Sequence, residues 1–179
     1  MPLTFTRSIV AILLPGGVAT IPWIFLAMDQ WPQAADIYAK HDALVAGFLF
    51  GLFVVIGKIF ETKGSNIESD WDKEREIEFS VKDNWFAYLA RSINPEPVGH
   101  RYIGRMVTSM YFELTMSFAT IGFFTGCAYL SFLSELEFRP LLMLGSLLLA
   151  FMAPKYFRDH AKDSHKVLCE VRQKINTLL

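Results

Sequence analysis

Four long apolar segments constrain the fold of this 179-residue chain more than any other feature. They cover residues 8–28, 43–60, 106–133 and 141–153. A helix of about 20 apolar residues crosses the hydrocarbon core of a bilayer, and the first three segments meet or approach that length. The fourth has 13 uncharged residues and reaches membrane length only with Phe138 and residues 155–157. A re-entrant or interfacial segment is therefore the alternative there.

The composition favours the same class of protein. Hydrophobic residues make up 53% of the chain and charged residues 20%, whereas about a quarter of the residues in a soluble domain are charged. We therefore expect an all-α, polytopic membrane protein with four transmembrane helices, a helical cytoplasmic loop and an amphipathic C-terminal helix. The net charge of −1 provides no basic field for phosphate groups, so direct nucleic-acid binding is not expected.

Charge divides the chain into four parts. An N-terminal transmembrane hairpin (1–60) precedes a charged loop (61–105), a second transmembrane hairpin (106–154) and an amphipathic tail (155–179). The two short loops outside these charged parts carry only Lys40 and Arg139 out of 17 Lys and Arg residues. Because Lys and Arg concentrate on the cytoplasmic side, we expect a multi-pass protein of the cell membrane with both termini in the cytoplasm.

The first apolar segment contains helix-breaking residues. Arg7 precedes it as in a signal peptide, but its length and the lack of a cleavage motif lead us to expect that it is retained. Pro15, Gly16 and Pro22 predict a kink in its helix. The kink is either tolerated by packing or serves as a hinge or gate.

Small residues recur at every fourth position in two of the segments. Ala43, Gly47 and Gly51 form one such ridge, and Gly122 and Gly126 form another. Ridges of this kind let a second helix backbone approach closely, in the same chain or in another copy. We expect helix packing at these residues and a homo-oligomer in the lipid bilayer.

The charged loop predicts two helices. Gly64 is placed to end the second apolar helix, and residues 65–68 resemble a capping box that starts a new one. A further helix is expected after Ser80, with an apolar stripe that includes Ile93 and ends at residues 94–95. A cytoplasmic partner could bind residues 66–93 and the tail, through the surface Trp71, Trp85, Leu89, Leu168, Val171 and Ile175.

Glu113 is the one acid within the third apolar segment. Ser109, Ser117 and Thr120 fall near the same helical face, which predicts a polar intramembrane face. A carboxylate inside a membrane is a candidate functional residue. It either lines a pore or handles protons, or it forms an interhelical hydrogen bond or a structural pair with a basic residue (Lys58, Arg101 or Arg105).

Motifs of enzymes and metal sites are missing from the sequence. It has no phosphate-binding loop, zinc-protease motif, CxxC pair or nucleophile elbow. His160 and His165 lie about 140° apart around a helix, and we found no second ligand on the face of any histidine. The alternation of acids with Lys73 and Arg75 in residues 70–78 is typical of a solvated helix face. We therefore expect no cofactor, no metal and no enzymatic activity.

The layout of four apolar segments around a charged helical loop is similar to that of several small bacterial membrane proteins. These include membrane components of anti-phage systems, such as the Kiwa membrane subunit, bacteriocin immunity proteins and secretion accessory proteins. The similarity covers topology and size, and it identifies no functional residue.

Three classes of function remain open from the sequence. The first is a membrane sensor or scaffold that oligomerises and recruits a cytoplasmic partner. The second is an oligomeric ion channel or membrane-permeabilising effector, and the third is an enzyme that acts on lipid. A bacteriocin-immunity or secretion accessory role is a further alternative.

Overall fold

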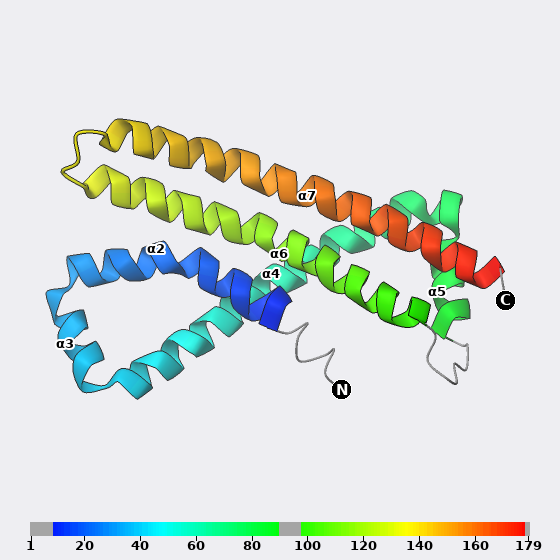
Figure 1. Cartoon of the computed structure of the whole chain (residues 1–179), viewed down its shortest axis with the longest axis horizontal. Helices are drawn as coiled ribbons and strands as arrows, with labels where there is room; N and C mark the ends of the chain where they lie inside the picture. The colour runs from blue at the N-terminus through cyan, green and yellow to red at the C-terminus, as the bar shows by residue number, and fades with distance from the viewer. Residues whose placement is uncertain (1–8, 90–97, 178–179) are drawn as a thin grey trace.

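The computed structural model describes residues 9–89 and 98–177, and these residues form α-helices preceded by a π-helical turn (Figure 1). The elements are η1 (Ile9–Leu13), α2 (Leu14–Gln30), α3 (Pro32–Lys40), α4 (Asp42–Phe79), α5 (Val81–Leu89), α6 (Val98–Leu133) and α7 (Arg139–Thr177). No strand occurs in the described ranges, which confirms the expected all-α class.

Four stretches of helix are long and apolar enough to cross a membrane: Ile9–Gln30, Asp42–Phe79, Tyr102–Leu133 and Arg139–Asn176. Of the helices that carry them, α4, α6 and α7 have 38, 36 and 39 residues. At a rise of about 1.5 Å per residue these three are about 54 to 59 Å long, nearly twice the thickness of about 30 Å of a hydrocarbon core. Only part of each long helix can therefore lie within such a core.

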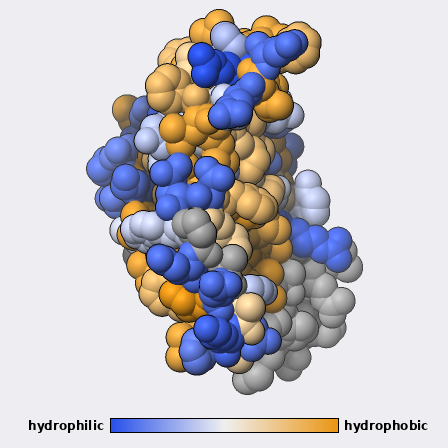
Figure 2. Space-filling view, turned by 90° about the vertical axis from the view of Figure 1, so that its left-hand side faces the viewer, coloured by the Kyte–Doolittle hydropathy of each residue, from blue (hydrophilic) through white to orange (hydrophobic). Residues whose placement is uncertain are grey.

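One end of the molecule, which we call the apolar half, comprises α2, α3, α4 up to residue 60, α6 from residue 118 and α7 up to residue 157. In this half α6 and α7 run side by side and α2 lies against α6 (Figure 1). Its large side chains point outward, with Phe48 69% and Phe151 78% exposed. Hydrophilic side chains gather among hydrophobic ones on its end face, where α2 joins α3 and α6 joins α7 (Figure 2).

Helix α4 crosses η1 and α2 at two glycines. A Cβ atom on Gly16 would lie 1.9 Å from the carbonyl oxygen of Phe53, and one on Gly57 would lie 1.9 Å from that of Ile12. Only glycine allows the backbones to approach so closely. Beyond this crossing α2 and α4 diverge toward α3 (Figure 1), and apolar side chains such as Phe48 line a cavity of about 1050 Å³ between them.

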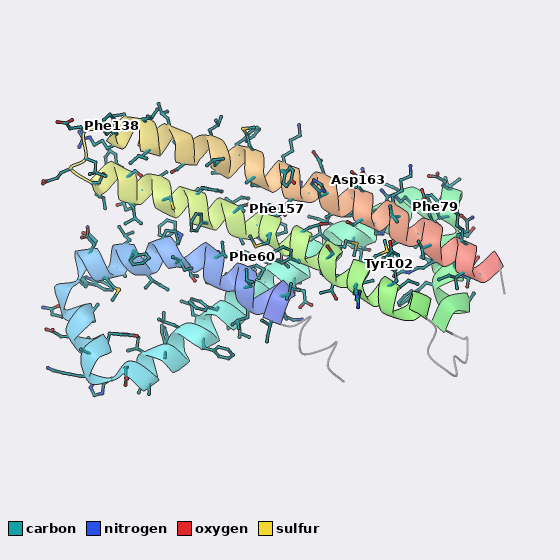
Figure 3. The ribbon with its side chains drawn as sticks, viewed as in Figure 1. Phe60, Phe79, Tyr102, Phe138, Phe157 and Asp163 are labelled. Carbon is teal, nitrogen blue, oxygen red and sulfur yellow. The ribbon has the colours of Figure 1, made fainter. Side chains whose placement is uncertain are left out.

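The other end of the molecule, which we call the helical module, comprises residues 61–89, 98–117 and 158–177. The clusters of large, buried apolar side chains in the described residues lie here. The buried residues form three clusters: Trp71, Met110, Leu114 and Ala161; Ile103 and Leu168; and Phe79, Val81 and Cys169. Figure 3 labels Phe79 and Asp163 in this module and Phe138 at the opposite end of the molecule.

The sequence pattern predicts a helix end at Gly64, but α4 does not end there. The helix continues to Phe79, and Gly64 is buried where a Cβ atom would lie 3.2 Å from Cβ of Leu114 on α6. The glycine thus permits close packing of α4 on α6 rather than a helix end. The predicted capping box lies inside α4, where Glu68 accepts a hydrogen bond from the hydroxyl of Tyr111.

The second predicted helix start agrees with the structure. Ser80 has a left-handed backbone conformation (φ 44°) and separates α4 from α5, which begins at Val81. The predicted helix end at residues 94–95, together with Ile93, lies outside the described residues. The predicted boundaries after residues 60, 105 and 154 all fall inside continuous helices.

Candidate functional site

Glu113 lies within the helical module, where its partner on α7 is in the charged part of that helix. Its Oε2 accepts a hydrogen bond from Ser164 Oγ at 3.1 Å, and Ser109 Oγ lies 3.5 Å from Oε1. Ser164 belongs to the charged part of α7, next to Asp163. The expected structural partner Lys58 instead bonds Glu61. Its contact is thus an interhelical hydrogen bond to α7, and because the candidate span Tyr102–Leu133 includes Glu113, its place within a membrane stays a prediction.

The hydroxyls on the predicted polar face are bonded within α6. Ser117 Oγ donates to the Leu114 carbonyl at 2.7 Å, and Thr120 Oγ1 donates to the Met116 carbonyl at 3.0 Å. Both residues are buried. Because each hydroxyl proton is used by the backbone of its own helix, neither residue presents a free donor to an aqueous path.

The two glycine ridges have different surroundings. A Cβ atom on Gly122 would lie 3.2 Å from Cβ of Ala19, and one on Gly126 would lie 2.7 Å from Cβ of Pro22, so this ridge packs on α2. Gly47 and Gly51 on α4 have no heavy atom of the described residues within 4 Å of such a Cβ position, and Ala43 beside them is exposed.

Two residues of the predicted partner surface are part of the core. Trp71 is 6% exposed and Leu168 is fully buried, because both pack inside the helical module. Val171 and Ile175 pack against the cluster of Ile103 and Leu168 and are partly buried. Trp85 is 37% exposed, with the Arg172 guanidinium 4.3 Å from its ring centroid. The side chain of Leu89 lies outside the described residues.

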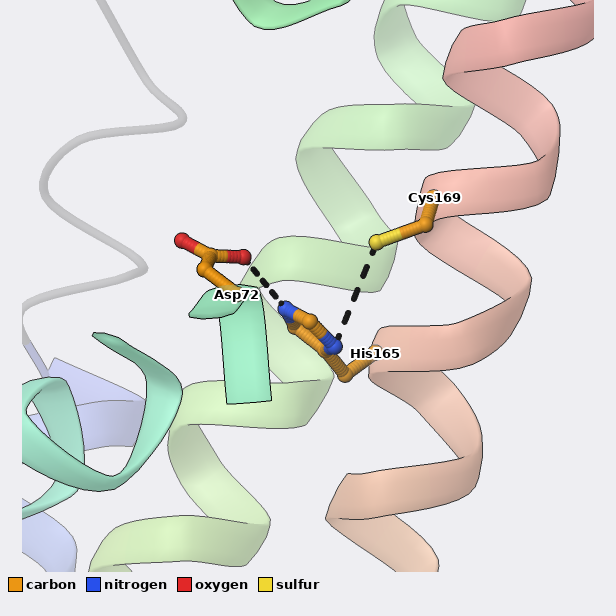
Figure 4. A group of neighbouring side chains, drawn as sticks. All are labelled: Asp72, His165 and Cys169. Atoms are coloured by element: carbon orange, nitrogen blue, oxygen red, sulfur yellow. Dashed lines mark hydrogen bonds and ion pairs between the residues drawn. The ribbon is translucent and has the colours of Figure 1, made fainter. Parts of the chain in front are cut away.

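A polar cluster that the sequence pattern did not reveal joins α4 to α7 (Figure 4). His165 Nε2 lies 2.9 Å from Asp72 Oδ1, and His165 Nδ1 lies 4.0 Å from Cys169 Sγ. The Arg75 guanidinium contacts Nδ1 and donates through Nη2 to the Lys162 carbonyl at 2.9 Å. The His165 side chain is only 1% exposed, so the imidazole is enclosed by these groups and by Trp71.

The prediction that no histidine shares a helical face with a second possible ligand is therefore wrong for His165. His165 and Cys169 are four residues apart, a spacing that places two side chains on one face of a helix. The His-x-x-x-Cys spacing is the signal in the sequence that indicates this pair. Asp72 could not be found from spacing, since it comes from a distant helix.

The protonation of His165 depends on opposing influences. Burial, the largest of them, lowers the pKa of the imidazole, but the hydrogen bonds to Asp72 and Cys169 and the charge of Cys169 raise it. The pKa is raised from 6.5 to about 9 even though Arg75 acts to lower it. Because a guanidinium only donates, the contact of Arg75 with Nδ1 is a hydrogen bond only when the ring is neutral and carries its proton on Nε2, toward Asp72.

Carboxylate, imidazole and thiolate are the donor types of zinc sites, and one ligand atom from each of Asp72, His165 and Cys169 lies within 4.8 Å of the others. A cation there would meet the positive charge of Arg75 at the imidazole. Cys169 is 3% exposed and packs against Phe79 and Val81, which closes the thiol to a substrate. We interpret the cluster as a hydrogen-bonded connection between α4 and α7.

Comparison of the chain with protein-family models, curated proteins and solved structures finds no match.

Proposed function

We propose that this chain is a non-enzymatic integral membrane scaffold or sensor subunit that self-associates in the bilayer and presents its helical module to a cytoplasmic protein. The observation that carries the proposal is the continuity of α4, α6 and α7, which run unbroken from the apolar half into the module. A displacement of these helices in the bilayer would therefore move the module directly.

The exposed ridge of α4 supports self-association. Only 6% of the most apolar stretch of α4 is buried within the chain, and the Cβ positions of Gly47 and Gly51 face open space. Small residues allow a second helix to approach until backbones touch, which is a main source of attraction between helices in lipid. A second copy of the chain would cover this ridge.

The module also carries a surface suited to a soluble partner. Ile77 on α4 is 98% exposed, and the acidic side chains of Glu74 and Glu78 on the same helix are exposed nearby in sequence. An apolar side chain among acids favours a partner with an apolar pocket rimmed by basic residues.

The other classes of function have weaker support. The channel alternative rests on Glu113, Ser117 and Thr120, and these side chains bond Ser164 or the backbone of α6. The enzyme alternative needs a nucleophile that a substrate can reach. In the cluster of Asp72, His165 and Cys169, the thiol of Cys169 is buried. A place in anti-phage defence rests on the similarity in layout alone.

Self-association is tested by the mass of the purified protein in detergent. The wild type should form an oligomer, and Gly47→Leu with Gly51→Leu should convert it to a monomer with an unchanged helical content. Gly145→Leu is the matched control, because Gly145 on α7 also faces open space. A monomeric wild type, or a ridge variant of unchanged mass, would contradict this part of the proposal.

Recruitment is tested by copurification from the native host. Ile77→Glu should release the cytoplasmic partner while the oligomer remains intact, because the side chain makes almost no contact within the chain. Retention of the same partner by the variant would show that Ile77 is not part of the docking surface.

A further inference from the structure

We propose that a hollow between α6 and α7 binds an anionic glycerophospholipid. The hollow has a volume of about 290 Å³ and lies where the apolar part of α7 ends and its charged part begins. The inference rests on the proposal that α6 and α7 cross a membrane, since only then does the hollow meet a lipid leaflet.

The hollow has an apolar wall of suitable shape for the upper part of an acyl chain. Phe118 and Ile121 of α6 and Phe151 of α7 line it, and the small side chains of Ser117 and Ala150 leave the space between them. Ser117 donates its proton to the backbone of α6, so this wall offers no free hydroxyl donor.

Two cations border the same hollow. Lys155 and Arg158 line it and lie three residues apart, on one face of α7. Both are exposed, and neither forms an ion pair with another described residue. A third cation comes from α4, where Lys63 Nζ lies 5.8 Å from the centroid of the Phe118 ring. Lys63 does not line the hollow, but it adds positive charge from a second helix beside the Phe118 ring.

An apolar wall next to cations favours a ligand that has both an apolar chain and an anionic headgroup. A free phosphate would bind the cations alone, whereas an anionic phospholipid would use the cations for its headgroup and the apolar wall for its chain. Basic pockets between transmembrane helices on the cytoplasmic side are known to bind anionic headgroups. The acid nearest to these cations in sequence, Asp159, is exposed and follows Arg158 directly, so it lies about 100° away around the helix.

The test uses the full chain in detergent and counts bound lipids by native mass spectrometry during titration with phosphatidylglycerol or phosphatidylcholine. We expect the wild type to prefer phosphatidylglycerol. Loss of Lys155 or Arg158 to Gln should weaken that binding about fivefold each and about thirtyfold together, if each cation contributes about 1 kcal/mol. Lys40→Gln with Arg139→Gln is the control of equal charge, at the far end of the apolar half.

Ala150→Leu distinguishes a shaped site from a basic surface, since it fills the hollow and keeps both cations. It should weaken the binding of phosphatidylglycerol, because the acyl chain loses its place against the wall while the cations remain. An unchanged affinity of Ala150→Leu for phosphatidylglycerol, equal binding of the two lipids by the wild type, or displacement of the lipid by inorganic phosphate would overturn the inference. A protein that fails to insert into lipid nanodiscs at all would instead contradict the membrane proposal on which it rests.

Discussion

Large apolar side chains are exposed in the apolar half of the molecule and buried in the helical module. In the apolar half, none of the most apolar stretch of α7 is buried within the chain, and Leu141 is 70% exposed. In the helical module, Met110, Leu114 and Leu168 are fully buried. The same helices pass through both halves, so the difference arises from side-chain sequence and surroundings rather than from helix type.

This difference is expected if water surrounds the helical module and lipid surrounds the apolar half. Water drives apolar side chains into a core, and the module buries three clusters of them as a soluble bundle does. Lipid exerts no such force between helices, so association there depends on close packing of small residues. The crossing of α4 with η1 and α2 at Gly16 and Gly57 is the clearest case of such packing.

The largest effect is expected from Gly57→Leu. The added side chain would collide with the backbone of Ile12, and because backbone cannot move aside as a side chain does, we expect a loss of about 3 kcal/mol or more. Thermal unfolding in detergent measures this, with Gly145→Leu as the control in open space. Equal melting temperatures for the two variants would show that η1 does not pack on α4 at this point.

The next prediction compares one large side chain from each half. Leu168→Ala should cost about 2 to 5 kcal/mol, because it opens a cavity in the core of the module. Phe151→Ala removes a larger side chain but one that is 78% exposed, so its melting temperature in detergent should change little. A larger fall in melting temperature for Phe151→Ala than for Leu168→Ala would contradict the assignment of the buried core to the helical module.

The sequence predicted the helices and the four apolar segments, because length and lack of charge identify them directly. It did not locate the point at which α6 leaves the apolar half. Residues such as Met110 and Leu114 are apolar because they fill the core of the module, yet in sequence they look like lipid-facing residues. The hydrogen bond of Glu113 to Ser164 could not be predicted either, because Ser164 lies on a distant helix.

Gly64 shows a second limit. A glycine followed by a capping pattern is a good signal for a helix boundary, but close packing on Leu114 requires the same residue. The His165 and Cys169 pair was detectable from its spacing of four, whereas Asp72 and Arg75 depend on the packing of α4 against α7.

A smaller, pH-dependent effect is expected at His165. Its pKa is raised from 6.5 to about 9 in the folded chain, so the stabilisation is fully present below pH 6.5 and is lost as the pH rises through about 9. We therefore expect the melting temperature of the wild type to fall over this range. Melting curves of His165→Gln should lack this component, and identical pH profiles would contradict it.

The smallest effect is expected from Glu113→Gln. A glutamine oxygen can still accept the proton of Ser164, so only the charge-assisted part of one hydrogen bond is lost, about 1 kcal/mol or less. Melting temperature and oligomer mass should stay close to those of the wild type. A collapse of expression would instead indicate a buried charged partner for Glu113.

The central claim is that the continuous helices α4, α6 and α7 extend from the bilayer into a cytoplasmic module. Single cysteines test it most directly. Cys127 and Cys169 are first replaced by alanine, and one cysteine is then placed either at Asn66 in the module or at Gln33 on α3. Both positions are exposed. An impermeant thiol reagent should label position 33 in intact cells and position 66 only after permeabilisation. Labelling of both positions in intact cells would contradict the account.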